Sequence, residues 1–450
     1  MSITSAVESN ETLKLTEWEL GNPHLPPVTT VTLYEGIAPV EFLRSRIARM
    51  LEINPWLTSR IVKKNAADGV MTLTYSKSLD VESAVEQHFS IYEHGEVDLS
   101  LGMSYEEIVG CLLPVQCARS KPATDEDEVL FKVAVVPIEA ETGAVDQSLP
   151  LQKTITLPCF ALVVSMNHTL GDGHTYYKLY NMLGVDAQNE GLDPVRVAGF
   201  EEAKTDIIGK EETAMFTSAG LSFGIVGTYV GAKLRGRGPQ NVCVHEVDSA
   251  WVTKEKDRSG QEAQVPFVSS NDVLTSWFFR EMKSDMNIMV ANLRSRRPAV
   301  LNLSDAHVGN YEANLPYFPG DIESPALIRQ SIRDTEGTFR AKRAGSPVTK
   351  IPSSLKLLRN WTSIVTNWAS FYCDVNLQKD PHGNNESTLR PKLHFPIMEP
   401  DGIITSVWNN AIIFRPRAGE LGMLTITRQF DNDTLAQEKE QDGPLGKRIL

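Results

Sequence analysis

The sequence predicts a two-domain α/β (α+β) protein, and three observations support this. The chain has 450 residues, which is too long for one ordinary hydrophobic core and suggests two domains of roughly 200 residues each. β-branched runs alternate with runs whose apolar residues recur at helical spacing. Between the halves, residues 191–213 are charged and show little pattern, so we place the inter-domain crossover there.

The first half predicts strands interleaved with helices. Residues 1–25 are expected to be a polar lead-in, and the β-branched run 28–34 to be the first strand. Residues 39–51 carry apolar side chains at helical spacing and end before an Asn-Pro pair. A hairpin is expected next. Its strands are 56–62 and 71–75, and beyond them we expect helices at 81–88 and 105–112 and buried neighbouring strands of a mixed sheet at 130–136 and 160–165.

The second half predicts a second sheet with flanking helices. Ser269 and Ser270 precede an apolar helical run and fit an N-terminal cap. We expect strands at 242–247, 288–293, 403–414 and 423–429, a turn at 254–260, helices at 327–339 and 353–361, and two short strands around a bend within 362–377. The expected division is residues 1–195 for the N-terminal domain, 196–241 for the linker and 242–450 for the C-terminal domain.

The composition narrows the class of protein. A formal charge of −13 argues against nucleic acid or an anionic membrane as a general partner. Five cysteines without a CxxC pair favour a reducing compartment over a disulfide framework or zinc cage. No signal peptide is visible, so we expect a soluble, cytoplasmic protein. The uncharged stretch 214–232 predicts either a lipid-contacting segment or a buried crossover, and its four glycines argue against a stable membrane span.

The stretch 160–183 concentrates the chemistry. It starts as an apolar strand, breaks at Gly171 and Gly173, and continues as an amphipathic helix. At the turn lie His168, Asp172 and His174. A potential base and a carboxylate are therefore expected where a buried strand ends.

Three interpretations of this turn remain open on the residues alone. His168 can be a general base that deprotonates a hydroxyl or an amine. The two histidines and Asp172 can be metal ligands, although their spacing matches no metal signature. His168 can also be a structural histidine beside a glycine turn. No G-x-S-x-G, Walker or G-x-G-x-x-G motif supplies a rival site.

The segment SMNHTLGDG, residues 165–173, resembles the HxxxDG signature of CoA-dependent acyltransferases of the BAHD type, chloramphenicol acetyltransferase and condensation domains of peptide synthetases. Further segments resemble BAHD-like enzymes in the expected order. They are residues 51–61, 269–277, 292–298 with 308–310, and 365–375. The chain is thus identified as a divergent BAHD-like acyltransferase, with the resemblance covering about residues 28 to 429.

The resemblance implies two similar domains, each a mixed sheet with flanking helices, and a channel between them. It implies that His168 is the base and that Asp172 pairs with Arg294. Thr366, Asn367 or Trp368 would lie near the developing oxyanion. The implied CoA-binding residues are Ser269, Ser270, Gly173 and Asn310. The implied co-substrate is acyl-CoA, and the implied partner is a small-molecule acceptor. We expect no permanent cofactor and no metal. We also expect a monomer, because two linked domains that form one channel need no second subunit.

Two differences from the family pattern matter. Where BAHD enzymes carry D-F-G-W-G, this chain reads Asp374, Val375, Asn376 and Leu377, which favours a divergent branch. Where condensation domains carry a double histidine, Asn167 precedes His168. Besides acyl transfer from CoA to a hydroxyl or an amine, two alternatives stay open: a non-catalytic binding protein with this fold, and transfer from a carrier-protein thioester.

Overall fold

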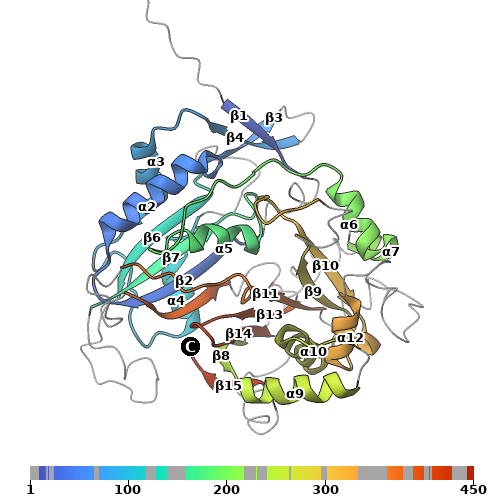
Figure 1. The fold of residues 1–450 in the computed structure, drawn as a ribbon. Coiled ribbons are helices and arrows are strands. Elements are labelled where there is room, and N and C mark those ends of the chain that lie inside the picture. The colour runs from blue at the N-terminus through green and yellow to red at the C-terminus, as the bar shows by residue number, and fades with distance from the viewer. Residues whose placement is uncertain are drawn as a thin grey trace, which may run out of the picture. The chain divides into compact units, whose positions relative to one another are not determined.

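The described part of the chain forms two compact units (Figure 1). Unit 1 contains Met1–Val197, Ser304–Asn310 and Phe371–Met398, and unit 2 contains Ala198–Leu303, Tyr311–Ser370 and Glu399–Leu450. The computed structural model describes residues 10–16, 19, 25–64, 70–117, 128–138, 158–216, 230, 241–262, 265–294, 302–332, 362–378, 389–399, 405, 408–427 and 443–450. The predicted mixed α/β class is confirmed.

Unit 1 is built on a five-stranded sheet with the order β12-β2-β7-β6-β5. These strands are β2 (Val28–Glu35), β5 (Phe89–Ile91), β6 (Phe131–Ile138), β7 (Cys159–Met166) and β12 (Pro391–Ile397). All neighbours are antiparallel except β5 and β6, which makes the sheet mixed as predicted. The predicted domain boundaries, at residues 195 and 242, assign all later residues to the second domain. β12 lies beyond both boundaries in the chain but belongs to the sheet of unit 1.

β7 is the best-buried strand of this sheet, because every one of its eight residues is buried. It has neighbours on both edges, β2 and β6, and a strand covered on both faces needs no alternation of polar and apolar residues. Its continuous apolar run therefore reports its central position. The chain leaves the sheet at its end, Met166, and enters the turn that carries His168.

Helix α5 (Gly173–Asn181) packs on this sheet through hydrogen-bonded tyrosines (Figure 1). The Tyr176 hydroxyl lies 2.5 Å from Thr30 Oγ1, and the Tyr180 hydroxyl lies 2.8 Å from Thr32 Oγ1. Because residues two apart share a face of a strand, both threonines of β2 face the helix. Both tyrosines are buried, and they fix the helix that follows the His168 turn.

The other helices of unit 1 bury apolar stripes. In α2 the buried side chains are Leu43, Ile47, Met50 and Leu51, which is helical spacing. Arg46 on this helix donates hydrogen bonds to three carbonyls just beyond α5, at Met182, Gly184 and Ala187. The bounds are α2 (Val40–Ile53), the 3-10 helix η1 (Pro55–Thr58), α3 (Val81–His88) and α4 (Tyr105–Leu112).

A small antiparallel sheet completes unit 1. β3 (Arg60–Lys64) and β4 (Val70–Ser76) form the predicted hairpin, and β1 (Asn10–Lys14) adds to the other edge of β4. Glu19 is only 2% exposed. The prediction of a polar lead-in over residues 1–25 is therefore wrong for β1 and for Glu19. The strand was missed because it is short and polar and has no pattern of apolar residues.

Unit 2 is built on a seven-stranded mixed sheet with the order β10-β9-β11-β13-β14-β8-β15. β11 is parallel to both of its neighbours, and the other pairs are antiparallel. The bounds are β8 (Asn241–Val247), β9 (Asn287–Asn292), β10 (Glu312–Tyr317), β11 (Thr362–Asn367), β13 (Trp408–Phe414), β14 (Gly422–Thr427) and β15 (Leu445–Arg448).

Helix α10 (Ser270–Met282) is the central helix of unit 2 and packs against α9, α12, β11 and β13. The predicted turn at 254–260 is wrong, since α9 (Ser249–Glu262) runs through it. Its buried residues Val252, Glu255 and Ser259 repeat at helical spacing, but two of the three are polar, which hid the helix. The remaining helices are α6 (Phe200–Ile208), α7 (Lys210–Phe216), α12 (Pro325–Ser331) and the 3-10 helix η2 (Pro319–Asp321).

Of the two strands expected within 362–377, only β11 forms; after it the chain turns away. Residues 353–361 and most of 214–232 lie outside the described residues. Among the helices that are described, none is both long and apolar enough to cross a membrane.

Candidate active site

The turn between β7 and α5 carries His168 and is braced by its own side chains. Asn167 Oδ1 accepts hydrogen bonds from the Thr169 backbone N–H at 2.9 Å and from the Thr169 hydroxyl at 2.8 Å. A Cβ on Gly171 would lie 2.7 Å from Thr175 Oγ1, so glycine is required for this close approach. Asn167 thus has a structural role where condensation domains place a second histidine.

Asp172 is the N-cap of α5. Its Oδ1 accepts hydrogen bonds from the Thr175 backbone N–H at 3.1 Å and from the Thr175 hydroxyl at 3.2 Å. The side chain is almost fully buried, with 1% of the residue exposed. A buried carboxylate at a helix N-terminus is stabilised by the helix dipole as well as by these donors. Asp172 therefore holds the start of α5 rather than pointing into solvent.

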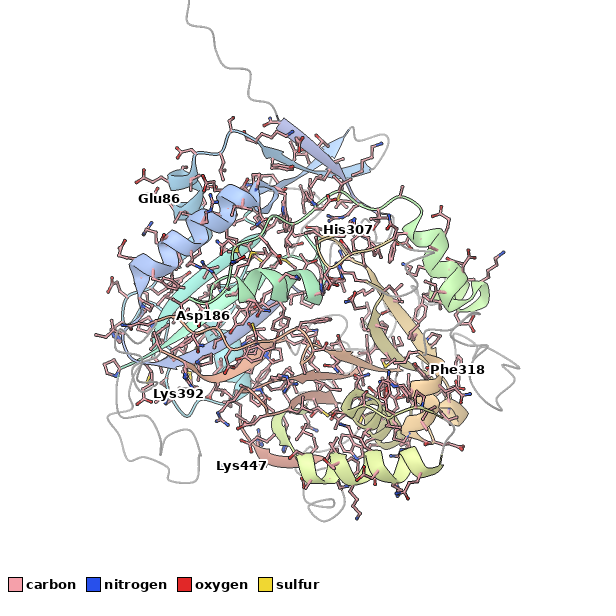
Figure 2. All side chains as sticks on the ribbon, in the orientation of Figure 1. Glu86, Asp186, His307, Phe318, Lys392 and Lys447 are labelled. Carbon is pink, nitrogen blue, oxygen red and sulfur yellow. The ribbon has the colours of Figure 1, made fainter. Side chains whose placement is uncertain are left out.

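A loop from later in the chain, Ser304–Asn310, covers the His168 turn within unit 1. Figure 2 shows its side chains and labels His307. The Asp172 backbone N–H donates to the carbonyl of Gly309 at 3.3 Å. Gly309 has a φ of 140°, a conformation that favours glycine. The loop thereby delivers Asn310 to His168.

Asn310 contacts both His168 and Glu19. Its Nδ2 donates to the backbone carbonyl of His168 at 2.8 Å and to Glu19 Oε1 at 3.0 Å. Its Oδ1 lies 3.2 Å from His168 Nδ1. Because an amide oxygen only accepts, Nδ1 of His168 must carry the proton in this arrangement. The neutral imidazole then presents an unprotonated Nε2, the form that a general base needs.

Glu19 is in turn paired with Arg196. The Arg196 Nε lies 2.9 Å from Oε1 and 3.1 Å from Oε2 of Glu19. The same guanidinium donates to the carbonyls of Thr169 and Leu170, at 2.9 and 3.3 Å, and so contacts the His168 turn directly. Both side chains of the pair are buried, with 6% of Arg196 and 0% of Glu19 exposed. A buried ion pair therefore closes the network behind His168.

The pKa of His168 is lowered, and the cause is burial, which disfavours the charged imidazolium. The hydrogen bond to Asn310 and the charges of Asp172 and Glu19 act in the opposite direction. The pKa of His88 falls to about 4, because burial and the positive charges of Arg60 and Lys132 outweigh its hydrogen bond to Phe131. His168 is therefore neutral at pH 7 while its surroundings still support a transient positive charge.

In unit 2, Arg294 follows the end of β9 and is 4% exposed. Its guanidinium lies 5.0 Å from the ring centroid of Tyr311, and NH1 donates to Asn292 Oδ1 at 3.2 Å. A planar guanidinium is suited to stacking on an aromatic face. Asp172 belongs to unit 1 and Arg294 to unit 2, so the predicted pairing between them stays a prediction.

The three oxyanion candidates lie at the end of β11 and differ in their contacts. Asn367 donates to Asn271 Oδ1 and accepts from the Ala369 backbone N–H, both at 2.9 Å. Trp368 is buried, and its backbone N–H donates to the carbonyl of Ile413 at 2.8 Å. Thr366 is half-buried, and its side-chain hydroxyl has no hydrogen-bond partner among the described residues. Its hydroxyl is the best remaining donor of the three.

Ser269 is the N-cap of α10, as the sequence predicts. Its hydroxyl forms a capping box with Asp272 and accepts from Arg329 NH2 at 2.7 Å. Ser270 is the first residue of this helix, and Gly173 is the first residue of α5; both are partly exposed. The role of these residues and of Asn310 in binding CoA stays a prediction.

The segment that replaces D-F-G-W-G is fastened within unit 1 by hydrogen bonds to its backbone. Asn181 Nδ2 donates to the carbonyl of Phe371 at 3.0 Å, and the Tyr34 hydroxyl donates to the carbonyl of Val375 at 2.7 Å. Asp374 accepts from the Tyr372 hydroxyl at 2.9 Å. Side-chain anchors thus hold the segment that has lost the glycines.

His174 contacts Phe371 and Asp305. Its ring lies edge-on to Phe371 with centroids 5.4 Å apart, and its Nε2 is 3.8 Å from Asp305. Among the described residues, no three His, Cys, Asp or Glu side chains converge in a group that could hold a metal ion.

Comparison with known proteins identifies the fold of this chain. No protein-family model and no curated protein matches the sequence. Solved structures do match. TRI101 of F. sporotrichioides, crystallised with coenzyme A and T-2, aligns at a TM-score of 0.57 and 10% identity, covering 97% of this chain and 100% of that one.

Two further structures agree. Vinorine synthase aligns at a TM-score of 0.53 and 11% identity, covering 97% and 98% of the two chains. The first condensation domain of the calcium-dependent antibiotic synthetase aligns at 0.55 and 12%, covering 95% and 94%. This chain has the CoA-dependent acyltransferase fold. The predicted resemblance is confirmed at the level of the fold, and at such low identity the comparison identifies no substrate.

Sequence reasoning missed Glu19 and Arg196. Glu19 stands in the segment interpreted as a polar lead-in, and Arg196 at the start of the charged crossover. Glu19 contacts Asn310, which is 291 residues away along the chain, and Arg196 contacts Glu19, which is 177 residues away. A local sequence pattern cannot predict contacts between residues so far apart.

Proposed function

We propose that this protein is an acyltransferase that moves an acyl group from a CoA thioester to the hydroxyl or amine of a small molecule. The fold is that of CoA-dependent acyltransferases, and structures of TRI101 hold coenzyme A together with T-2 or deoxynivalenol. Further support is that unit 1 positions one histidine at the HxxxDG turn. Since one chain supplies every predicted site residue, we propose a monomer, in the cytoplasm.

The observation that carries the proposal is the state of His168. Nδ1 faces the oxygen of Asn310, and Nε2 is hydrogen-bonded to no described residue. The lowered pKa keeps the ring neutral at pH 7. A neutral, oriented imidazole with one unprotonated nitrogen is what proton abstraction from an acceptor requires.

The proposed reaction is direct transfer. Nε2 of His168 takes the proton of the acceptor hydroxyl or amine as its oxygen or nitrogen attacks the thioester carbonyl. A tetrahedral oxyanion forms, stabilised by the hydroxyl of Thr366. When the intermediate collapses, the C–S bond breaks and the leaving thiolate takes the proton from the imidazolium. The products are an ester or amide and free CoA, and no acyl-enzyme forms.

Asp172 has a supporting role in this proposal. It caps α5 and so holds the turn that carries His168. We propose that its charge pairs with Arg294, because two buried charges of opposite sign stabilise each other when the geometry is bidentate. The proposed CoA contacts are those of the family resemblance, Ser269, Ser270, Gly173 and Asn310.

The test is release of free CoA thiol from a panel of acyl-CoAs with mixed alcohol and amine acceptors. His168→Ala should lower turnover by about 100-fold or more, the loss expected for a general base. The matched control is His88→Ala, which removes a buried imidazole from the same unit at a position hydrogen-bonded to Phe131. Wild-type turnover in the His168 variant would sink the proposal, as would an acyl-enzyme trapped for mass spectrometry.

A second set of acyl donors distinguishes CoA-dependent transfer from transfer by a carrier protein. The same acyl groups are offered on coenzyme A and on a phosphopantetheinylated carrier protein. Condensation-type transfer predicts turnover with the carrier alone. A binding protein predicts saturable CoA binding with no thiol release from any donor. We expect turnover with acyl-CoA, because Asn167 is committed to the turn and supplies no second base.

A further inference from the structure

The buried pair of Glu19 and Arg196 has no role in the proposed reaction, yet it lies directly behind the base. Glu19 Oε1 accepts from both the backbone N–H and the Nδ2 of Asn310, at 3.3 and 3.0 Å. Arg196 also donates to two carbonyls of the His168 turn. One charged pair thus holds both the residue bonded to His168 and the turn that carries it.

The chemistry of Glu19 decides how the amide of Asn310 is oriented. An ionised carboxylate can only accept hydrogen bonds, and so can the backbone carbonyl of His168. The two hydrogens of Asn310 Nδ2 face these two oxygens. Rotating the amide by half a turn would bring its oxygen against both of them, which is repulsive. Oδ1 is therefore directed at Nδ1 of His168.

The role of Arg196 is to make a buried Glu19 anionic at low cost. An isolated carboxylate in the interior would be strongly disfavoured, and a guanidinium that contacts both of its oxygens removes most of that penalty. The remaining donors of the guanidinium meet carbonyls, at Pro194, Val308, Thr169 and Leu170. The pair is thus satisfied and rigid.

We infer that the Glu19–Arg196 pair is a positioning element for His168: through Asn310 it selects the ring nitrogen that carries the proton and sets the direction of the imidazole. This inference rests on the proposed function, because orientation of Nε2 matters only if His168 acts as a base. Neither residue touches the reacting atoms. An effect on the reaction must therefore pass through Asn310 and the turn.

The test combines Glu19→Gln with a direct measurement of the tautomer. The substitution keeps the shape and removes the charge. Nitrogen-15 NMR of histidine-labelled protein distinguishes protonated from unprotonated ring nitrogens, and the His168 signals are assigned by their absence in His168→Ala. The wild type should show a protonated Nδ1. In Glu19→Gln the other tautomer should become populated, since a glutamine can donate as well as accept, and only the carbonyl of His168 is left as an obligatory acceptor for the amide of Asn310.

The kinetic readout has a specific form. In Glu19→Gln, kcat should fall by about tenfold or more, the usual size for losing a partner that orients an imidazole. The acidic limb of kcat/KM should move to lower pH, because the charge of Glu19 raises the pKa of His168. Asp172, the other charge that raises it, is unchanged in this variant.

The matched control is Glu255→Gln in α9 of unit 2. Glu255 is 6% exposed and its Oε2 lies 2.6 Å from Arg258 NH2, so the same chemical change breaks another arginine pair of a buried glutamate. It should lower stability to thermal unfolding without changing the tautomer of His168, kcat or the pH profile. A merely structural Glu19 would behave like this control, and that result would overturn the inference.

Two further outcomes keep the inference distinct from the proposed function. If Glu19→Gln does not fold, the wild-type spectrum still decides, because a proton on Nε2 instead of Nδ1 overturns the inference without any variant. If the tautomer shifts as expected while wild-type protein transfers no acyl group from any donor, the proposed function fails and the positioning effect stands.

Discussion

The two units hold their predicted site residues in different ways. In unit 1 the turn after β7 is held by segments far away in the chain: Glu19, Arg196 and the loop with Asn310. In unit 2 Arg294, two residues beyond the end of β9, is hydrogen-bonded to Asn292 and stacks on Tyr311. A base needs its orientation and proton fixed, which takes several partners; a guanidinium is permanently charged and needs only a direction.

The largest effect should come from Asp172→Ala in the turn of unit 1. It removes the cap of α5 and, in the proposed pairing, leaves the buried charge of Arg294 without its partner, so we expect a loss of about 3–5 kcal/mol in the free energy of unfolding. Asp80→Ala is the control, because Asp80 caps α3 in the same way from an exposed position and should cost only about 1 kcal/mol. Denaturant titration measures both, and equal losses would contradict the role assigned to Asp172.

The next effect concerns catalysis from unit 2. Thr366→Val removes the proposed oxyanion donor while keeping the shape of the side chain, and kcat should fall by about 100-fold. Thr366→Ser keeps the hydroxyl and should restore most of the rate. If the valine variant turns over like the wild type, Thr366 is not the donor and attention moves to Asn367 and Trp368.

A substitution at the turn tests how tightly unit 1 is packed there. In Gly171→Ala the new Cβ would meet Thr175 at 2.7–2.8 Å, which should cost about 1–3 kcal/mol of stability. Gly110→Ala is the control, since a Cβ at this position of α4 meets nothing within 4 Å. That change should be neutral or stabilise the helix by up to about 1 kcal/mol. Thermal unfolding of the two variants gives the contrast.

Two helix caps compare the units directly. Ser104→Ala in unit 1 removes an exposed capping box and should cost about 1 kcal/mol. Ser269→Ala removes the same box from α10 and in addition a hydrogen bond from Arg329, so the loss should be larger by about 1 kcal/mol. Chemical denaturation of both variants checks the order, and a smaller loss for Ser269 would reverse it.

The mildest expectation is a pH dependence that leaves neutral pH unaffected. His168 acts as a base when it is unprotonated, and burial lowers its pKa below the usual 6.5. The acidic limb of kcat/KM should therefore lie below pH 6.5, with activity constant from there to neutrality. A pH–rate profile of the wild type is the measurement. A limb above pH 6.5 would mean that the imidazole is less buried, or the charged form better stabilised, than the structure shows.

The sequence predicted most elements because their signals are local. The run 28–34, the hairpin before Ser76 and the strand–turn–helix at 160–183 were placed correctly from periodicity, and Ser269 was recognised as a cap. Two of the failures have one cause. α9 has a polar buried face, and β1 is too short and polar to show alternation. Patterns of apolar residues cannot report elements whose buried side chains are polar.

The same distinction between local patterns and long-range contacts applies to the candidate site. HxxxDG is a local pattern, so His168 and Asp172 could be named from residues that stand four apart. The tautomer of His168 could not be named, since it depends on an amide 142 residues away. Asn310 was singled out through the family resemblance, but its two-sided contact with His168 and Glu19 came only from the structure.

The sequence alone determined where the candidate base lies: a buried strand, two glycines and a capped helix put one histidine at a turn, because backbone preferences act over a few residues. The tertiary structure decided what state that histidine is in. It joined Glu19, Arg196 and Asn310 behind the turn and added β12 beside β2. Such contacts follow from packing of the whole unit, where burial, charge and hydrogen bonding must be satisfied together.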